Sequence, residues 1–254
     1  GSEMCIRDRL NTLPSSAVII GAGAVALEFA SLWNAAGCEV TLLIRKDRVL
    51  STWERRASMT LTRELKRRGV NVIARTAVDR VDTGANLGAT VHYRQGDSDE
   101  DRTAYGEVVL AAIGRVPNTD ADWFRSSGLK LDERGYVTVD GYGRTNLDGV
   151  WALGDITPGH ALAHRAFEQG ITIAEKIAGA DPKPVLDDTV PQVVFSFPEA
   201  ASVGLTLDQA KAREDVVEPK ETAYPMLSNA RMLMSGEGGS MTVVSGAFAN
   251  NPDM

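Results

Sequence analysis

The sequence predicts an α/β fold built on a parallel β-sheet. Short apolar runs alternate with stretches of helical periodicity, in the order strand, helix, strand, helix, strand. The first apolar run, Val18–Ile20, ends at a pair of glycines, and the chain then continues as a helix. A glycine also stops each helix before the next strand begins. This order is typical of parallel strands joined by right-handed crossovers.

The two helices of this unit have recognisable boundaries. The first is predicted over residues 24–36, and the strand after it over 39–44, which is rich in apolar and β-branched residues. A capping box of Ser51 and Glu54 predicts the start of the second helix, which should end at Arg68. Helical spacing gives the first helix one apolar face, formed by Val25, Phe29, Leu32, Trp33 and Ala36.

The pattern changes after a third strand, expected at residues 70–74. Residues 76–82, 89–95 and 106–113 alternate or run apolar, with glycine and aspartate between them. Such short runs with turn signals predict a small antiparallel meander attached to the parallel half.

Beyond a loop at 114–120, two short strands are expected at 135–140 and 149–155. One long helix is predicted at 161–179. Its helically spaced apolar residues are Ala163, Ala166, Phe167, Ile171, Ala174 and Ile177.

The last part of the chain follows a linker with two prolines at 181–188. It predicts strands at 190–197 and 239–246 and a short helix around 207–212. A sheet that stops in a meander leaves an unpaired edge, so this segment does not read as a finished domain.

Composition narrows the possible functions. The net charge of −7 argues against a general nucleic-acid binder. No apolar run approaches the roughly 18 to 20 residues of a membrane span. Cys5 and Cys38 are the only cysteines, so the chain holds no close cysteine pair and suits a reducing cytoplasm. We expect a cytoplasmic protein that binds neither nucleic acid nor membrane and has no metal site.

The glycine turn after the first strand indicates a dinucleotide site. Gly21 allows a tight turn, and Gly23 lacks a Cβ, so that a pyrophosphate can approach the backbone. Ala26 stands where a small residue packs helix against strand. The helix N-terminus supplies free N–H groups and a partial positive charge. A purely structural glycine-rich turn is the alternative interpretation.

The end of the second strand bears on the choice of nicotinamide cofactor. An acidic residue there would bind the adenosine ribose of NAD. This sequence instead has Ile44, followed by Arg45 and Lys46, with Arg48 nearby. Cations suit the 2′-phosphate of NADP, so the pattern favours NADP, with a solvated basic loop as the alternative.

Three further stretches carry a family resemblance: AAIGRVPN at 111–118, TNLDGVWALGD at 145–155 and ALAHRAFEQG at 161–170. In this order they resemble the FAD-dependent pyridine nucleotide–disulfide oxidoreductases over about residues 13–254. The opening residues show neither periodicity nor turn signals, so residues 1–12 are expected to be a non-native or disordered leader. The resemblance implies three further parts. They are a Rossmann-like NAD(P)-binding domain (13–118), the C-terminal part of an FAD-binding domain (119–187), and the N-terminal part of an α+β dimerisation domain (188–254).

The resemblance also implies roles for individual residues. Gly21, Gly23 and Glu28 match the dinucleotide turn and a ribose-side carboxylate. Val78 and Gly114 match positions that line the adenine and nicotinamide ends. Asp155 matches the residue that binds the ribityl hydroxyls of FAD. The turn that meets the flavin matches Ala161, Leu162, Ala163 and His164, where the helix N-terminus faces the flavin edge that gathers negative charge.

Two signals disagree on the branch of the family. Asn229 and Arg231 resemble the dihydrolipoamide dehydrogenase branch, whereas residues 42–50 resemble NADPH-dependent glutathione reductases. We favour the former, which implies electron transfer between NAD(P)H and a dithiol or disulfide through FAD, in a homodimer when full length. An NADPH-dependent reductase of a small disulfide is the runner-up.

The departures from the family pattern are informative. Its first FAD-binding glycine turn, its redox-active cysteine pair and its C-terminal His–Glu pair have no match in this sequence. We therefore expect an internal fragment with no catalytic residue of its own. A flavoprotein without disulfide chemistry and a nucleotide-binding module without turnover remain alternatives.

Overall fold

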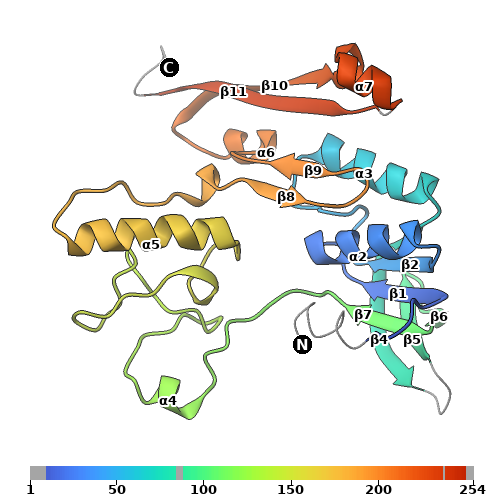
Figure 1. Cartoon of the computed structure of the whole chain (residues 1–254), viewed down its shortest axis with the longest axis horizontal. Helices are drawn as coiled ribbons and strands as arrows, with labels where there is room; N and C mark the ends of the chain where they lie inside the picture. Colours follow the sequence, from blue (N-terminus) through green and yellow to red (C-terminus); the bar gives the residue numbers. More distant parts are fainter. Residues whose placement is uncertain (1–9, 84–87, 237, 250–254) are drawn as a thin grey trace. The chain divides into compact units, whose positions relative to one another are not determined.

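The computed structural model describes residues 10–83, 88–236 and 238–249 and divides the chain into two compact units. The first unit combines the chain up to Ile113 with the chain from Val193 onward, and the second holds Gly114–Gln192. Figure 1 shows the elements of each unit in sequence colours. Residues 1–9 of the predicted leader (1–12) lie outside the described residues.

A four-stranded parallel sheet organises the first unit (Figure 1). Its spatial order is β3 (Asn71–Ala74), β2 (Glu39–Ile44), β1 (Ser16–Ile20) and β7 (Val108–Ala111). The predicted parallel α/β fold is therefore confirmed. Parallel strands are buried on both faces, which explains their nearly continuous apolar sequences.

The assignment of 106–113 to the meander was wrong. The run VVLA of β7 pairs in parallel with β1, because an uninterrupted apolar strand is suited to the buried sheet. The meander instead consists of β4 (Thr76–Thr83), β5 (Ala89–Gln95) and the more polar β6 (Arg102–Gly106).

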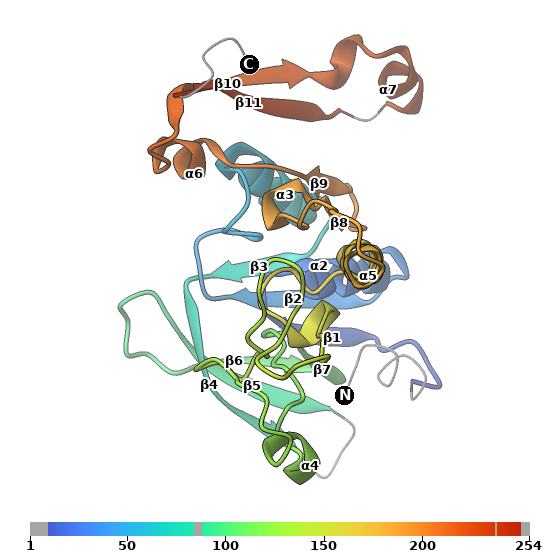
Figure 2. The same ribbon diagram turned by 90° about the vertical axis from the view of Figure 1, so that its left-hand side faces the viewer.

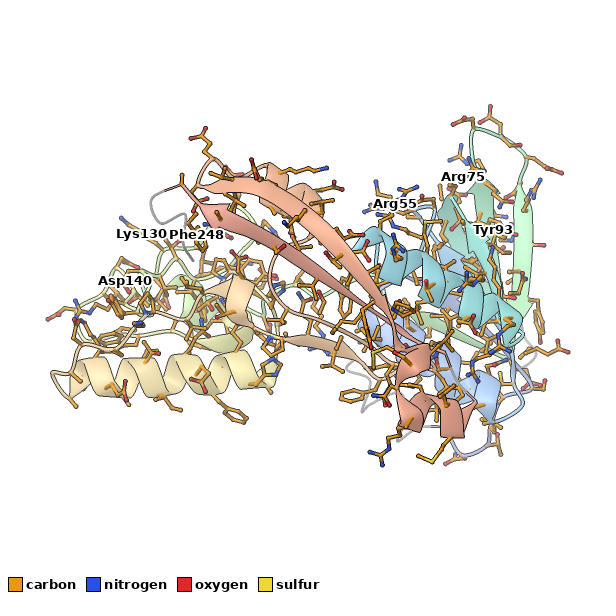
Figure 3. The ribbon with its side chains drawn as sticks, turned by 90° about the horizontal axis from the view of Figure 1, so that it is seen from above. Arg55, Arg75, Tyr93, Lys130, Asp140 and Phe248 are labelled. Atoms are coloured by element: carbon orange, nitrogen blue, oxygen red, sulfur yellow. The ribbon has the colours of Figure 1, made fainter. Side chains whose placement is uncertain are left out.

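The meander and the first helix, α2 (Ala24–Ala35), cover opposite faces of the parallel sheet, as Figure 2 shows. Ile19 of β1 faces the helix side, and its neighbour Val18 packs with Val91 and Tyr93 of the meander. Tyr93 is labelled in Figure 3. Adjacent strand residues point to opposite faces, so β1 contributes to both cores.

The predicted apolar face of α2 was wrong in detail. Leu32 is exposed, and the buried residues are Ala26, Leu27, Ala30 and Trp33. Small residues face the sheet because they let the helix axis come close to it. Periodicity that follows only large side chains therefore selects a face rotated from the buried one.

The second helix, α3 (Arg55–Arg67), begins later than a cap at Ser51 predicts. Its N-cap is Glu54, whose carboxylate accepts from the N–H groups of Arg56 at 2.6 Å and Ala57 at 2.9 Å. Glu54 thus satisfies the first free donors of the helix, which is the role that the capping box assigned to Ser51.

The second unit is mainly loops around α4 (Asp122–Arg125), the 3-10 turns η1 (Gly154–Ile156) and η2 (Asp187–Thr189), and α5 (Ala163–Ile177). The strands expected at 135–140 and 149–155 are only isolated bridges. Aspartates close turns there: Asp140, for example, accepts through its Oδ1 from two backbone N–H groups at 2.9 Å. Backbone donors used in such turns are not available to a strand ladder.

The helix expected at 161–179 is confirmed as α5, but its helically spaced apolar residues do not form its buried face. Phe167, Ile171 and Ile177 are exposed, and the buried residues of this helix are Arg165, Thr172 and Ile173. An apolar stripe therefore runs along α5 on the side away from the buried face of the unit.

The C-terminal part of the chain has more regular structure than its sequence indicates. The pairs β8 (Gln192–Val194) with β9 (Ala200–Ser202) and β10 (Val216–Pro225) with β11 (Ser240–Phe248) form two-stranded sheets. The helices are α6 (Leu207–Lys211) and α7 (Ala230–Ser235), and η3 (Met226–Ser228) precedes α7. Sequence analysis missed β10 and α7.

Residues 193–197 form a strap that lies on α2. Val194 is 1% exposed and joins the core beneath the helix. The Glu28 carboxylate accepts the Phe195 N–H at 2.9 Å, and the Ser31 hydroxyl accepts the Phe197 N–H at 3.0 Å. The Arg68 guanidinium covers the Phe197 ring at 3.7 Å. The Glu28 and Ser31 contacts join the strap to α2.

Glu28→Ala should loosen this strap. It removes a charged acceptor from the Phe195 N–H, so we expect a loss of about 1 to 2 kcal/mol in the free energy of unfolding and faster amide exchange in residues 193–197. Glu28→Gln, which keeps an acceptor oxygen, is the matched control and should stay close to wild type. Equal stability and exchange in all three proteins would contradict the strap contact.

Cys38 should resist alkylation in the folded chain. Burial raises the pKa of its thiol, and the carboxylates of Glu107 and Glu39 add to the effect. A raised pKa means less thiolate at a given pH, and the thiolate is the reactive form. Mass spectrometry after iodoacetamide treatment at pH 8 should find Cys38 labelled only when denaturant is present. Rapid labelling of the folded protein would be inconsistent with this burial.

Candidate functional site

The strand order of the first unit creates a topological switch point. From β1 the chain moves to β2 and β3 on one side and later returns to the other side as β7. In such sheets ligands bind at the carboxyl ends of the strands where the order reverses. The ends of β1 and β7 lie side by side, since Ala112 donates its N–H to the carbonyl of Ile20 at 2.8 Å.

Glycine stands at residues 21 and 23 for two different physical reasons. Gly21 has a φ of +140°, and a Cβ there would collide with the carbonyl of Ala112, so the fold itself requires glycine. Gly23 has an ordinary φ of −88°, and no atom lies within 4 Å of the position its Cβ would occupy. The fold does not require glycine at residue 23, and the space beside it is open.

The N-terminus of α2 opens onto this space. Gly23 is its N-cap and has no side chain to accept a hydrogen bond, and the first turn contains no acidic residue. By contrast, Glu54 caps α3 and Thr206 caps α6 through their side chains. Free N–H groups at a helix start bind anions such as a diphosphate. Ala26, one turn later, is fully buried against the sheet.

Basic residues follow the neighbouring strands. Ile44 at the end of β2 is buried, and Arg45 and Lys46 after it are exposed. Arg75, which sequence analysis missed, donates its N–H to the carbonyl of Lys46 at 3.0 Å. Figure 3 labels Arg75 where the chain passes from β3 to β4, and Arg55 at the first position of α3. The signal for Arg75 was its position directly after a strand, equivalent to that of Arg45.

These cations differ in how they are paired. Across the described ranges, Arg45, Lys46 and Arg75 have no carboxylate within ion-pair distance. Arg48 instead pairs with Asp47 at 3.1 Å and donates to the carbonyl of Ser51 at 3.1 Å. Arg75 also has a φ of +58°, a conformation that costs a non-glycine residue energy and is enriched at functional sites.

The remaining residues predicted in the first unit have other surroundings. One oxygen of the Glu28 carboxylate accepts the Phe195 N–H, as described above. Val78 is half-buried and packs against the meander core. Gly114, the first residue of the second unit, has a φ of +126° and no atom within 4 Å of a Cβ.

The second unit brings together the residues predicted for the flavin. Asp155 lies in η1, and its half-exposed carboxylate is 3.7 Å from the guanidinium of Arg115. Helix α5 begins after Leu162 with no side-chain cap and no acidic residue in its first turn. Ala161, Ala163 and His164 are exposed around this helix start.

The three histidines each contact neighbouring residues of the chain. His164 donates from Nε2 to the carbonyl of Pro191 at 2.7 Å. His160 lies 3.3 Å from the amide of Gln192, and His92 is flanked by Asp82 and Asp101 on the meander. Among the described residues no group of histidine, cysteine and acidic side chains is arranged to hold a metal ion, and no helix is long and apolar enough to cross a bilayer.

Comparisons with known proteins show the family of this chain. Residues 3–170 match the family model of the pyridine nucleotide-disulphide oxidoreductases. The chain is 38% identical over 229 residues to dihydrolipoyl dehydrogenase of Geobacillus stearothermophilus, with 88% of this chain and 46% of that protein covered. It is 36% identical over 225 residues to the enzyme of the same name from Cupriavidus necator, with the same two shares covered.

Solved structures show the same relationship. The crystal structure of LpdA from Mycobacterium tuberculosis superposes with a TM-score of 0.82 at 30% identity, covering 92% of this chain and 50% of that one. The flavoprotein disulfide reductase RclA from Escherichia coli gives a TM-score of 0.79 at 25% identity, covering 94% of this chain and 55% of that one. The chain spans about half the length of the curated relatives it matches. With the family model matching most of its length, this chain belongs to the pyridine nucleotide-disulphide oxidoreductase family.

Proposed function

We propose that this chain carries the NAD(P)-binding domain (13–118), part of the FAD-binding domain (119–187) and the first part of the dimerisation domain (188–254) of a flavoprotein oxidoreductase. The whole protein would transfer electrons between NAD(P)H and a dithiol or disulfide through FAD, which the similarity to proteins named dihydrolipoyl dehydrogenase supports. The observation that carries the proposal is the uncapped start of α2 at the switch point of the sheet.

The dinucleotide would lie across the carboxyl ends of β1 and β7. Its diphosphate would accept hydrogen bonds from the free N–H groups at the start of α2, with Gly23 leaving room for the approach. Gly21 keeps the strand ends close together, and Ala26 keeps the helix close to the sheet. Val78 and Gly114 are the residues we assign to the two ends of the dinucleotide.

The second unit has features that suit FAD. Asp155 presents a half-exposed carboxylate that could accept from ribityl hydroxyls. The uncapped N-terminus of α5, with the turn from Ala161 to His164, would stabilise negative charge on a neighbouring ring. FAD, when bound, would supply the two-electron chemistry that connects nicotinamide with disulfide. The chain's own share is to bind, orient and tune it.

We assign no catalytic residue to this chain. Cys38 is the single cysteine among the residues that the structure describes, and it is buried with a raised pKa. A buried, protonated thiol with no partner thiol cannot take part in disulfide exchange. A dithiol or disulfide substrate and a homodimer are proposed from the family, and a cytoplasmic location from the low cysteine content.

The basic residues favour NADP over NAD. Arg45, Lys46 and Arg75 follow adjacent strands, and none of the three is neutralised by a carboxylate in the described part of the chain. Charge-assisted bonds to a 2′-phosphate are strong, and no acidic residue stands at the end of β2 to bind a free ribose. This observation supports an NADPH-dependent reductase of a small disulfide as the second candidate function.

A pair of glycine substitutions tests the dinucleotide site. Gly23→Ala meets open space, so its stability should change by less than about 1 kcal/mol, while affinity for NAD(P)H should fall because the Cβ blocks the diphosphate. Gly21→Ala should instead destabilise the fold by about 2 kcal/mol or more. Thermal unfolding and nicotinamide fluorescence titration separate the two effects. Unchanged affinity in a folded Gly23→Ala protein would refute the proposed site.

The cofactor preference is tested by Arg45→Glu. Loss of a charged phosphate contact should weaken NADPH binding about 10-fold to 100-fold and leave NADH binding nearly unchanged. Arg63→Glu on α3, also an exposed arginine, is the control and should affect neither cofactor. Isothermal titration with both dinucleotides gives the comparison. Equal losses for NADPH and NADH would reject a phosphate contact at Arg45.

A further inference from the structure

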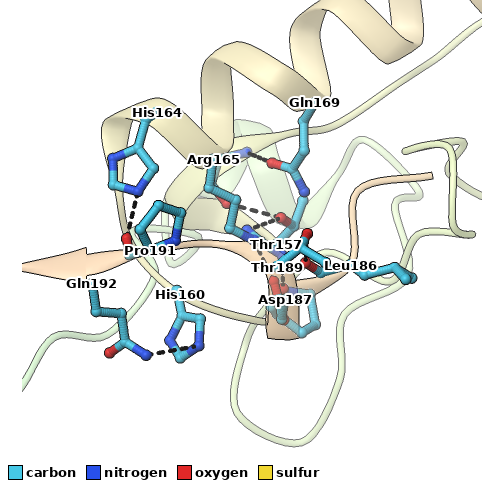
Figure 4. Close-up of polar contacts among 12 residues, drawn as sticks. Thr157, His160, His164, Arg165, Gln169, Leu186, Asp187, Thr189, Pro191 and Gln192 are labelled. Atoms are coloured by element: carbon cyan, nitrogen blue, oxygen red, sulfur yellow. Dashed lines mark hydrogen bonds and ion pairs between the residues drawn. The ribbon is translucent and has the colours of Figure 1, made fainter. Parts of the chain in front are cut away.

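The second unit buries one charged side chain that the proposed chemistry does not use. Arg165 lies in the first turn of α5 and is 5% exposed. Figure 4 shows its guanidinium pointing away from the helix, toward the loop after η1 and toward η2. Arginine is rarely buried without several acceptors, so its partners indicate what it does.

Each part of the Arg165 guanidinium has an acceptor. Its Nε donates to the Asp187 carboxylate at 2.6 Å, and Nη2 donates to the carbonyl of Pro158 at 2.5 Å. Nη1 lies 3.5 Å from the hydroxyl of Thr157. One side chain thus joins the start of α5, the loop at 157–158 and η2.

Gln169, one turn further along α5, holds the other end of the same loop. Its side-chain oxygen accepts the N–H of Gly154 at 2.8 Å. The Thr157 hydroxyl closes the loop by donating to the carbonyl of Gly154 at 2.8 Å. Residues 154–158, which include Asp155, are therefore anchored at both ends to successive turns of one helix.

The local sequence suits this arrangement. Gly159 has a φ of +121°, and a Cβ there would collide with both the Arg165 guanidinium and the Asp187 carboxylate. The ion pair therefore closes directly over a glycine. His164 and His160 add contacts to Pro191 and Gln192, so that residues 187–192 follow the turn before α5 (Figure 4).

A buried ion pair is not by itself a source of stability, because both charges lose their hydration. What the planar guanidinium supplies is geometry, since its fixed fork orients several acceptors at once. The groups that it orients are the loop carrying Asp155 and the turn leading to the uncapped start of α5.

We propose that Arg165 is a positioning residue, which with Gln169 fixes the loop at 154–158 and the turn before α5 and so sets the geometry of the flavin contacts. The inference rests on the FAD site proposed above. Arg165 itself touches no part of that site, and Asp155 and the helix start do the binding.

Three variants test this role in the chain as it stands. Arg165→Met removes the fork, Arg165→Lys keeps the charge without the fork, and Arg125→Met removes an exposed arginine of the same unit as the control. Without added FAD, amide exchange in residues 154–162 should be about tenfold faster in Arg165→Met, intermediate in Arg165→Lys and unchanged in Arg125→Met. Exchange in both Arg165 variants equal to that of the control would overturn the proposal.

Titration with FAD provides the second readout. Arg165→Met should bind FAD about tenfold more weakly, with altered flavin absorbance maxima, and Arg165→Lys should recover part of both. Wild-type affinity and spectrum in an Arg165→Met protein with a loosened loop would overturn the positioning role. If the wild-type chain, which carries only part of the FAD-binding domain, takes up no FAD, the exchange comparison alone decides whether Arg165 fixes the loop.

Discussion

The contact between the ends of β1 and β7 is the constraint on which the rest of the first unit depends. The carbonyl of Ala112 occupies the space where a side chain at Gly21 would stand, so the two strands can end side by side only with glycine there. That closeness brings the reversal of strand order to one point of the sheet. The start of α2 follows two residues later, and its free donors face the same point.

Two kinds of polar group are left available at the candidate site, the N–H donors at the start of α2 and the cations after β2 and β3, and each is explained by what the fold omits. Gly23 provides no side chain to cap α2. The end of β2 provides no carboxylate, and Arg45, Lys46 and Arg75 have no carboxylate within ion-pair distance in the described ranges. Elsewhere the chain satisfies such groups, as Glu54 does for α3 and Asp187 does for Arg165. Groups left unsatisfied on a well-packed scaffold are suited to a ligand.

The sequence predicted the elements better than it predicted their faces. The bounds of β2 agree with those observed, because an apolar, β-branched run between a glycine and a basic loop permits few alternatives. The face of α2 was rotated because small residues, which give no strong signal, make the closest contact with the sheet. The apolar stripe on α5 is exposed. Helical periodicity predicts that such a stripe exists, but it does not predict which part of the protein packs against it.

At the candidate site, too, some residues could be proposed from the sequence and others could not. Gly21 and Gly23 could be proposed from sequence because two glycines between a predicted strand and a predicted helix form a recognisable pattern. Arg75 and Arg165 were missed because a charged residue is expected to be solvent-exposed unless its neighbours in space are known. The strap contact of Glu28 was missed for a similar reason, since its partner is 167 residues away in the chain.

That long separation has a consequence for biosynthesis. The second unit interrupts the first, so the ribosome makes α2 and the sheet well before it makes the strap that completes their core. Until Val194 emerges, the apolar surface it covers stays open to solvent, and the entire intervening unit must be translated in that state. A nascent chain stalled within the second unit would therefore expose a hydrophobic site of the kind that chaperones bind, even though every strand of the parallel sheet had already been made.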